Sequence, residues 1–111
     1  MKHVIRESEI KELEFPNINV KELIDSDKPS FSIAKIKLKG VNDKTKNTLS
    51  DVYYYILEGS GKFVIDGAEH SVNKGDLVCI PKNSVYQDSG NLLMLSICLP
   101  KFNFDKVVVE K

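Results

Sequence analysis

The sequence lacks an excess of charge of either sign, because its 16 lysine and arginine residues are balanced by 16 aspartate and glutamate residues. A protein that binds nucleic acid through phosphates needs a concentrated basic surface, which this balance does not suggest. The chain also lacks an apolar run of the roughly 20 residues that a membrane span requires. Its start, Met1-Lys2-His3, is not followed by the apolar segment of a signal peptide. We therefore expect a cytoplasmic protein whose partners include neither nucleic acid nor membrane.

Cysteine and histidine are scarce, with two residues of each among 111. Cys79 and Cys98 lie in apolar runs without a Cys-x-x-Cys spacing, so we expect both to be small buried core residues. His3 lies at the start of the chain, where order is often lost, and His70 lies alone in a short polar strand. A lone histidine is more often a rim residue than a ligand, because a metal needs several donors.

The segment 51–86 indicates the fold class. Runs of β-branched and aromatic residues are separated there by short turns that contain Gly59, Gly67 and Gly75. This even spacing is typical of a small all-β barrel or sandwich. A chain of 111 residues fits one such domain and can fold around its own core without disulfides.

The single expected domain, residues 1–111, has three parts. Residues 1–30 carry apolar residues between charges and are expected to form short N-terminal strands. Residues 31–100 form the barrel core, and residues 101–111, with Val107-Val108-Val109, form a C-terminal strap or one more strand. Within the core, the lysine- and asparagine-rich segment 41–50 is expected to be a solvated loop, with a mobile lid over the barrel as the alternative.

Two stretches resemble the motifs of the cupin family. The first is Tyr55-Ile56-Leu57-Glu58-Gly59-Ser60-Gly61, and the second combines Gly75-Asp76 with Ile80-Pro81. The resemblance implies an all-β, cupin-type double-stranded β-helix, also called a jelly-roll barrel. It also implies a homodimer, since the N-terminal strands of many cupins pack on a partner's sheet. The alternative is that these strands only cover the edge of their own barrel.

The positions at which cupins usually hold a metal depart from the family pattern. Counted from Gly59 and Gly75, the family's four ligand positions hold other residues here: Lys46 and Thr48 (or, with a longer gap, Thr45 and Asn47), Val52 and Tyr86. A first-row metal needs about three or four imidazole, carboxylate or thiolate donors at one point. We therefore expect no metal and no other cofactor.

Strand phase predicts which side chains face the barrel interior. If the family's register holds, Val52, Tyr54 and Ile56 point inward, and Tyr86 and Asp88 share the inward face of a later strand.

The apolar strand 92–99 has two faces. We expect one to form the core, and it consists of Leu93, Leu95, Ile97 and Leu99. We expect the other to line a cavity, and it consists of Met94, Ser96 and Cys98.

The candidate ligand-binding residues are Tyr54, Tyr86, Asp88, Thr48 and Lys46. Two phenols and a carboxylate can hold a carbohydrate-like or aromatic small molecule by stacking and hydrogen bonding. A phenol with its ordinary pKa of about 10 is a poor base at neutral pH unless a cation such as Lys46 lowers it. No catalytic residue can be assigned on these grounds.

The favoured hypothesis is a metal-free cupin barrel that binds a small molecule without turnover. The first alternative is an enzyme of the isomerase, epimerase or lyase type, or one that uses a metal with atypical ligands. Metal-free cupins that act as sugar-nucleotide epimerases use a histidine base, and no histidine occurs in the matching strands here. The second alternative is a barrel kept for structural or partner contacts. Whether the protein is an enzyme stays open at this stage.

Overall fold

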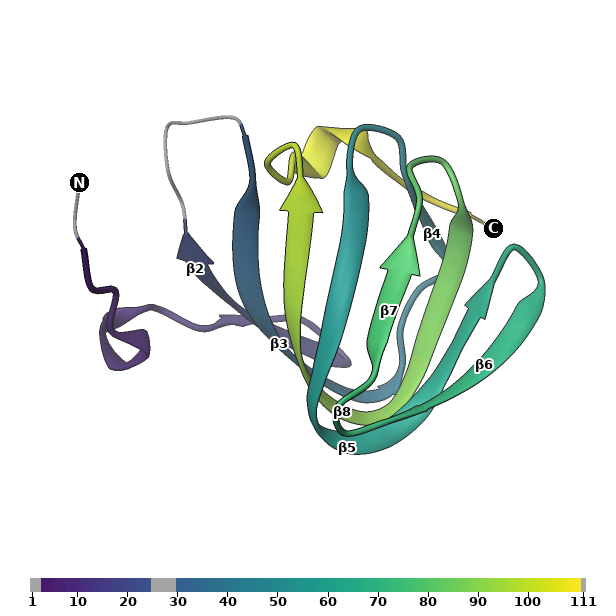
Figure 1. Ribbon diagram of the computed structural model, residues 1–111, viewed down its shortest axis with the longest axis horizontal. Helices are drawn as coiled ribbons and strands as arrows, with labels where there is room; N and C mark the ends of the chain where they lie inside the picture. The colour runs from purple at the N-terminus through teal and green to yellow at the C-terminus, as the bar shows by residue number, and fades with distance from the viewer. Residues whose placement is uncertain (1–2, 25–29, 111) are drawn as a thin grey trace.

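Strands account for nearly all regular structure in the computed structural model, which describes residues 3–24 and 30–110 (Figure 1). The nine strands of this described part form one curled sheet in which every pairing is antiparallel. The strands are β1 (Leu13–Glu14), β2 (Ile18–Ile24), β3 (Ser32–Val41), β4 (Thr45–Asn47), β5 (Asp51–Ile65), β6 (Ala68–Asn73), β7 (Leu77–Ile80), β8 (Val85–Leu99) and β9 (Val107–Val109). Two short 3₁₀ turns, η1 (Glu7–Glu9) and η2 (Phe104–Lys106), lie near the ends. The predicted all-β jelly-roll class is confirmed.

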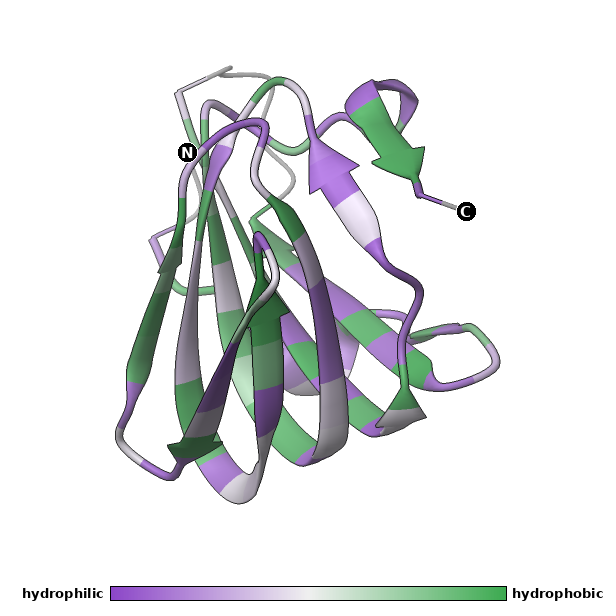
Figure 2. Ribbon diagram, turned by 90° about the vertical axis from the view of Figure 1, so that its right-hand side faces the viewer, coloured by the Kyte–Doolittle hydropathy of each residue, from purple (hydrophilic) through white to green (hydrophobic). Residues whose placement is uncertain are grey.

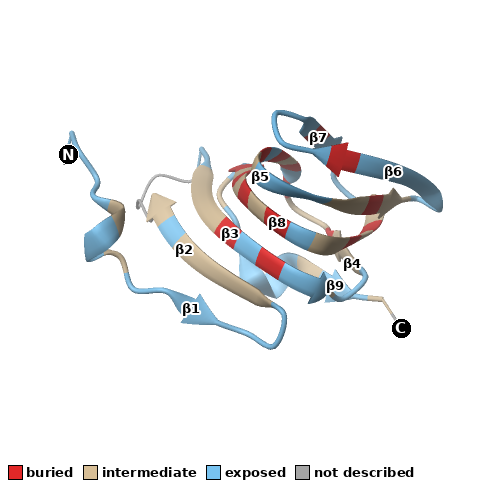
Figure 3. Ribbon diagram, turned by 90° about the horizontal axis from the view of Figure 1, so that it is seen from below, coloured by how far each residue is buried: buried red, intermediate tan, exposed pale blue. Residues whose placement is uncertain are grey.

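Two long strands, β5 and β8, run through both layers of the barrel (Figures 1 and 3). The C-terminal part of β8 lies between β3 and the first half of β5. The N-terminal part of β8 lies between β4 and the second half of β5. Strands β7 and β6 pair with the two halves of β5 in turn, so each layer ends at one of them. The two layers enclose the core.

Glycines allow β5 and β8, which are paired along their length, to bend where both pass from one layer to the other. Gly59 and Gly90 have positive φ angles of 92° and 121°. A Cβ atom on Gly59 would lie 2.0 Å from the carbonyl oxygen of Asn91, and one on Gly90 would lie 2.6 Å from the Cα atom of Gly61. Any larger residue at Gly59 or Gly90 would therefore force the two strands apart, so close packing of β5 on β8 requires glycine at both positions.

Alternate residues of β5 face the interior, as the strand phase predicts. Val52, Tyr54 and Ile56 are buried, whereas Tyr55 is exposed. Figure 2 shows the matching alternation of apolar and polar residues along the strands, and Figure 3 shows the buried residues on β3, β5, β7 and β8 and at the end of β6. The other buried apolar residues are Ile36, Leu38, Phe63, Val72, Val78, Ile80, Tyr86, Leu92, Met94 and Cys98.

The two faces of β8 are the reverse of the expectation. The face expected to line a cavity is buried in the core, and it consists of Met94, Ser96 and Cys98. The face expected to be core is half-buried or exposed, and it consists of Leu93, Leu95, Ile97 and Leu99. The prediction was wrong because both faces are largely apolar, so composition could not decide between them. The register decides instead, since Cys98 lies opposite the inward-facing Val52.

Cys79 corrects a second expectation, because its side chain is exposed. Its neighbours Val78 and Ile80 occupy the inward positions of β7 and leave Cys79 on the outer face. Cys98 is buried as expected, and burial raises the pKa of its thiol.

The segment 41–50 is neither a solvated loop nor a mobile lid throughout. It contains β4, which pairs with both β8 and β9. Asn47 and Ser50 are buried, and the Asn47 Oδ1 atom accepts hydrogen bonds from the backbone N–H groups of Leu49 and Ser50. The prediction was wrong because the polar residues satisfy a buried turn rather than water. The Val107-Val108-Val109 run forms β9, so of the two alternatives for this run, a strap or one more strand, the strand is observed.

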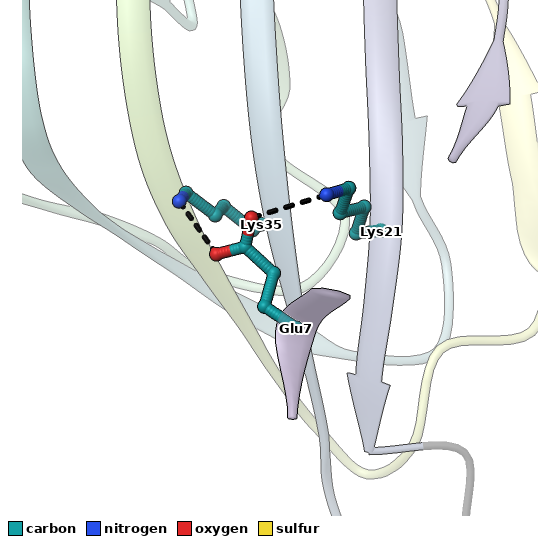
Figure 4. A network of polar contacts seen from close by, with 3 residues as sticks. All are labelled: Glu7, Lys21 and Lys35. Carbon is teal, nitrogen blue, oxygen red and sulfur yellow. Dashed lines mark hydrogen bonds and ion pairs between the residues drawn. The ribbon is translucent and has the colours of Figure 1, made fainter. Parts of the chain in front are cut away.

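The N-terminal segment reaches β3 through β1 and β2, which pair in order with it. Figure 4 shows Glu7 of η1 held by two strand lysines, with its carboxylate oxygens 2.7 Å from Lys35 Nζ and 3.1 Å from Lys21 Nζ. Hydrogen bonds from Lys35 and then Lys21 lower the pKa of Glu7. In the described part of the chain, no helix is long and apolar enough to cross a membrane.

Candidate functional site

Two phenols meet inside the barrel. Tyr54 comes from β5 and Tyr86 from β8, and their hydroxyl oxygens are 2.8 Å apart. The Tyr54 ring also packs against Phe63, with ring centroids 5.3 Å apart. Both tyrosines are buried, so the inward phase that the sequence predicts for them is the observed one.

Burial sets the ionisation of the two phenols. It raises the pKa of Tyr86 to about 12 and raises the pKa of Tyr54 well above its ordinary value. Both phenols are therefore protonated at neutral pH and can donate hydrogen bonds. Lys46, the cation considered for lowering the pKa of a phenol, lies with its Nζ atom 3.7 Å from a carboxylate oxygen of Glu110.

Asp88 is a carboxylate in the core, with 1% of its surface exposed. It lies opposite Phe63 in the β5–β8 register and two residues from Tyr86 on the same face. The Asn42 amide donates a hydrogen bond of 3.2 Å to Asp88 Oδ1. Burial raises the pKa of Asp88, and the Asn42 hydrogen bond opposes this shift. The Asp88 proton is therefore held more tightly than that of a solvated aspartate.

The structure brings together three of the five sequence-predicted residues, Tyr54, Tyr86 and Asp88. Thr48 lies apart from them, since its hydroxyl donates to the backbone carbonyl of Lys106. Lys46 is turned to Glu110.

Thr45 and Asn42 occupy places near the phenols and the carboxylate that sequence reasoning did not assign to the site. Thr45 lies opposite Tyr86 and shares its face, within hydrogen-bonding reach of the phenol. The longer of the two gaps in the family motif points to Thr45 and was the only sequence signal for it. No local signal pointed to Asn42.

The donor set does not fit the metal that cupins usually hold. The four positions carry Thr45, Asn47, Val52 and Tyr86 in the observed register, and the Asn47 oxygen is committed to its own turn. Among residues 3–24 and 30–110, no three His, Cys, Asp or Glu side chains gather so that they could hold a metal ion.

A groove of about 430 Å³ lies between β6 and β7, and Tyr54, Tyr86 and Asp88 do not line it. Two residues that line it, Val78 and His70, lie directly opposite Tyr54 and Phe63 in the strand pairings. His70 is exposed, as expected of a rim residue. A volume of this size falls in the range of small-molecule sites, which is roughly 300–1,000 Å³.

One curated protein shows the family of the chain. The uncharacterized protein MJ1618 of Methanocaldococcus jannaschii is 31% identical over 91 residues, which cover 80% of this chain and 69% of that protein. No protein-family model matches the chain.

Solved structures show the fold. Streptomyces PAC13 with uridine, in a variant that has glutamine in place of a histidine, matches with a TM-score of 0.92 and 20% identity over 100% of this chain and 92% of that one. A further matching structure is that of Pac13 described as a unique nucleoside dehydratase. KdgF from Halomonas sp. matches with a TM-score of 0.82 and 16% identity over 95% and 98% of the two chains. A cupin-2 domain protein from Rhodospirillum rubrum matches with a TM-score of 0.82 and 17% identity over 100% and 82%.

Proposed function

Because this chain has the cupin fold and belongs to the family of the archaeal protein MJ1618, we propose that its barrel binds a small, neutral, hydroxyl-bearing molecule without a metal. The binding residues are Tyr54, Tyr86 and Asp88, with Asn42 and Thr45 beside them.

The observation that carries the proposal is the polar cluster at the centre of an otherwise apolar core. Asp88 is the only residue with an acidic or basic side chain among the buried residues of the described part. Burying a carboxylate costs free energy, and an apolar residue of similar size is often as stabilising or more so. A carboxylate next to two phenols is therefore better explained by a ligand than by the needs of the fold.

The chemistry of the cluster favours a neutral ligand that donates hydrogen bonds. Protonated phenols can donate, and Asp88 can accept from a hydroxyl or N–H group. An anionic ligand would meet a carboxylate without a compensating cation, since Lys46 is paired with Glu110. Uridine, which is bound to the Streptomyces PAC13 variant, has the hydroxyl and N–H donors of this class.

A lyase-type enzyme is the second candidate. The likeness to a nucleoside dehydratase and a buried carboxylate with a raised pKa favour it, because such carboxylates are common among proton-transfer groups. Incubation with uridine tests it: a product lighter by one water in mass spectrometry establishes turnover, and unchanged uridine rejects this activity on uridine.

Binding is tested by thermal shift and by ¹⁵N NMR titration with uridine, with uridine 5′-monophosphate as the charged counterpart. Stabilisation by uridine should follow RT ln(1 + [L]/Kd), about 2.7 kcal/mol at 100-fold excess over Kd. Tyr86→Phe should weaken binding, whereas Tyr55→Phe, which removes an exposed phenol from the opposite face of β5, should not. Equal binding by Tyr86→Phe and the parent protein would contradict the assigned site.

We also propose that the protein is a homodimer. Two rows of side chains cross the outer face of one layer, and we name them the outer patch: Ile33, Ile97, Tyr53 and Cys79 in one row, and Leu95, Tyr55 and Leu77 in the next. Tyr55 and Leu77 are 42% and 57% exposed. A second copy of the chain suits this surface, because the patch itself is uncharged and a net charge of zero gives no long-range repulsion between copies.

A further inference from the structure

The connection from β3 to β4 contains one residue too many, and the excess lies opposite Asp88. Val41 pairs with Ser89, and Thr45 pairs with Tyr86. Between these pairs, three residues (42–44) face only two on β8 (87–88). Residues 42–44 form no strand, so this is a bulge-like connection, which we call the bulge. Like a β-bulge within a strand, an extra residue here can bend the chain and re-aim a side chain, and bulges are frequent next to active sites.

The first residue of the bulge, Asn42, has all its polar groups hydrogen-bonded. Its backbone N–H donates to the Asp88 carbonyl at 3.0 Å, and its carbonyl accepts from Gln87 Nε2 at 2.9 Å. Its Oδ1 atom accepts from the backbone N–H of Asp43 at 2.9 Å. Because only the amide oxygen can accept that bond, the Nδ2 group is the one that faces Asp88 Oδ1.

We propose that Asn42 is a positioning residue for Asp88 in the ligand site, and that the bulge exists to deliver it. The amide donates to Oδ1 and, together with the backbone N–H of Asp88 itself, fixes the side-chain rotamer, so that a ligand hydroxyl can add a further hydrogen bond to the carboxylate. This inference rests on the proposed function, and it specifies a ligand that carries a hydroxyl or N–H donor at the point facing Asp88.

A structural role alone would look different, and the chain offers the comparison. Asn47 is also an asparagine with a hydrogen-bonded side chain, but its Oδ1 atom only closes the turn that follows β4. Asn42 instead contacts the one acidic side chain of the described core. The titratable groups that face Asp88 are Tyr54 and Tyr86, whose pKa values are raised, so Asp88 titrates between two neutral phenols.

The test compares Asn42→Ala with Asn47→Ala in the full chain. The ¹³C NMR signal of the Asp88 carboxyl group, followed against pH, gives its pKa in each variant. Removing a donor to the carboxylate should raise the pKa of Asp88 in Asn42→Ala, because the donor favours the ionised form. Asn47→Ala should lower the melting temperature and leave the Asp88 titration unchanged. Asn42→Gln, which keeps the amide, should restore part of the difference.

Uridine titrations of the same variants supply the second measurement. Asn42→Ala should weaken uridine binding about five- to tenfold, whereas Asn47→Ala, measured below its melting temperature, should bind as the parent protein does. If the pKa of Asp88 in Asn42→Ala equals that in the parent protein, the positioning role is overturned, whatever the affinity of the variant for uridine. A shifted Asp88 titration without uridine binding to the parent protein retains the contact and rejects the proposed ligand class. If Asn42→Ala does not fold, Asn42→Leu takes its place, because leucine is similar in size to asparagine and lacks the amide. An Asp88 titration in Asn42→Leu equal to that of the parent protein would then contradict the positioning role.

Discussion

Asp88 is the residue whose burial is hardest to explain by the needs of the fold. Its carboxylate is buried, opposite Phe63 and near two phenols, and it accepts hydrogen bonds from the Asn42 amide in the β3–β4 connection and from its own backbone N–H. Charged groups in such surroundings destabilise a protein unless they are fully paired. Residues that perform a function are often retained at this kind of cost.

Replacement of Asp88 by asparagine should stabilise the protein at neutral pH. Burial raises the pKa of Asp88 in the folded chain above the value of about 3.9 in the unfolded chain. The folded state therefore binds the proton more tightly, and the associated stability is present below the unfolded pKa and lost as the pH rises through the folded pKa. Asp88→Asn should remove this loss and raise the unfolding free energy at pH 7 by about 0.5–2 kcal/mol.

Urea unfolding between pH 3 and pH 8 measures this effect, and Glu7→Gln is its control. The pKa of Glu7 is lowered by Lys35 and Lys21, so its contribution has the opposite sign: it is present above the unfolded pKa and lost as the pH falls. If the Asp88→Asn variant has a lower free energy of unfolding than the parent protein at pH 7, the hydrogen bonds of the carboxylate fully offset the cost of burying it.

The bends of β5 and β8 decide the architecture at the scale of the element. Each strand can cross from one layer to the other only because glycine permits backbone contact at the crossing, where Gly59 approaches Asn91 and Gly90 approaches Gly61. The bend also carries Tyr86 across the barrel to Tyr54, so the phenol contact depends on it.

Gly59→Ala should therefore destabilise the protein much more than Gly67→Ala. Both glycines have positive φ angles, 92° and 85°, so both substitutions carry the cost of a left-handed alanine, about 1–2 kcal/mol. Only Gly59 lacks space, because nothing lies within 4 Å of a Cβ atom on Gly67. The additional overpacking should cost Gly59→Ala about 1–3 kcal/mol more. Chemical denaturation of the two variants measures the difference, and equal stabilities would contradict the close approach.

The same elements show what the sequence could predict. The inward phase of β5 was predictable, because the position of Gly59 in the family motif fixes which residues before it, Val52, Tyr54 and Ile56, point inward. The phase of β8 was not, since both of its faces are apolar and its pairing with β5 is long-range. Asn42 was missed for a related reason: a one-residue bulge is visible only when the pairings on both of its sides are known.

At the scale of the whole molecule, the half-buried face of β8 is the surface on which the proposed dimer depends. The residues expected to be core lie instead in and around the outer patch, where the chain itself does not cover them. The row that contains Leu95 continues to Lys35 and Lys21, and both of these lysines form ion pairs with Glu7. The surface therefore passes from an ion-paired edge to an apolar region, which is the usual arrangement of an interface core and its polar rim.

If a second copy covers the outer patch, Tyr55→Glu should produce monomers. A carboxylate at that position would lie between Leu95 and Leu77, where dimer formation would have to bury it unpaired. Light scattering coupled to size exclusion measures the mass, and Phe104→Glu is the matched control, because Phe104 is 75% exposed and lies outside the patch. The Cys79 thiol reports on the same face: its reaction with a thiol reagent should be slow in the concentrated parent protein and fast in Tyr55→Glu. A parent protein that is monomeric at high concentration, with a freely reactive Cys79, would leave the outer patch without a second copy as its partner.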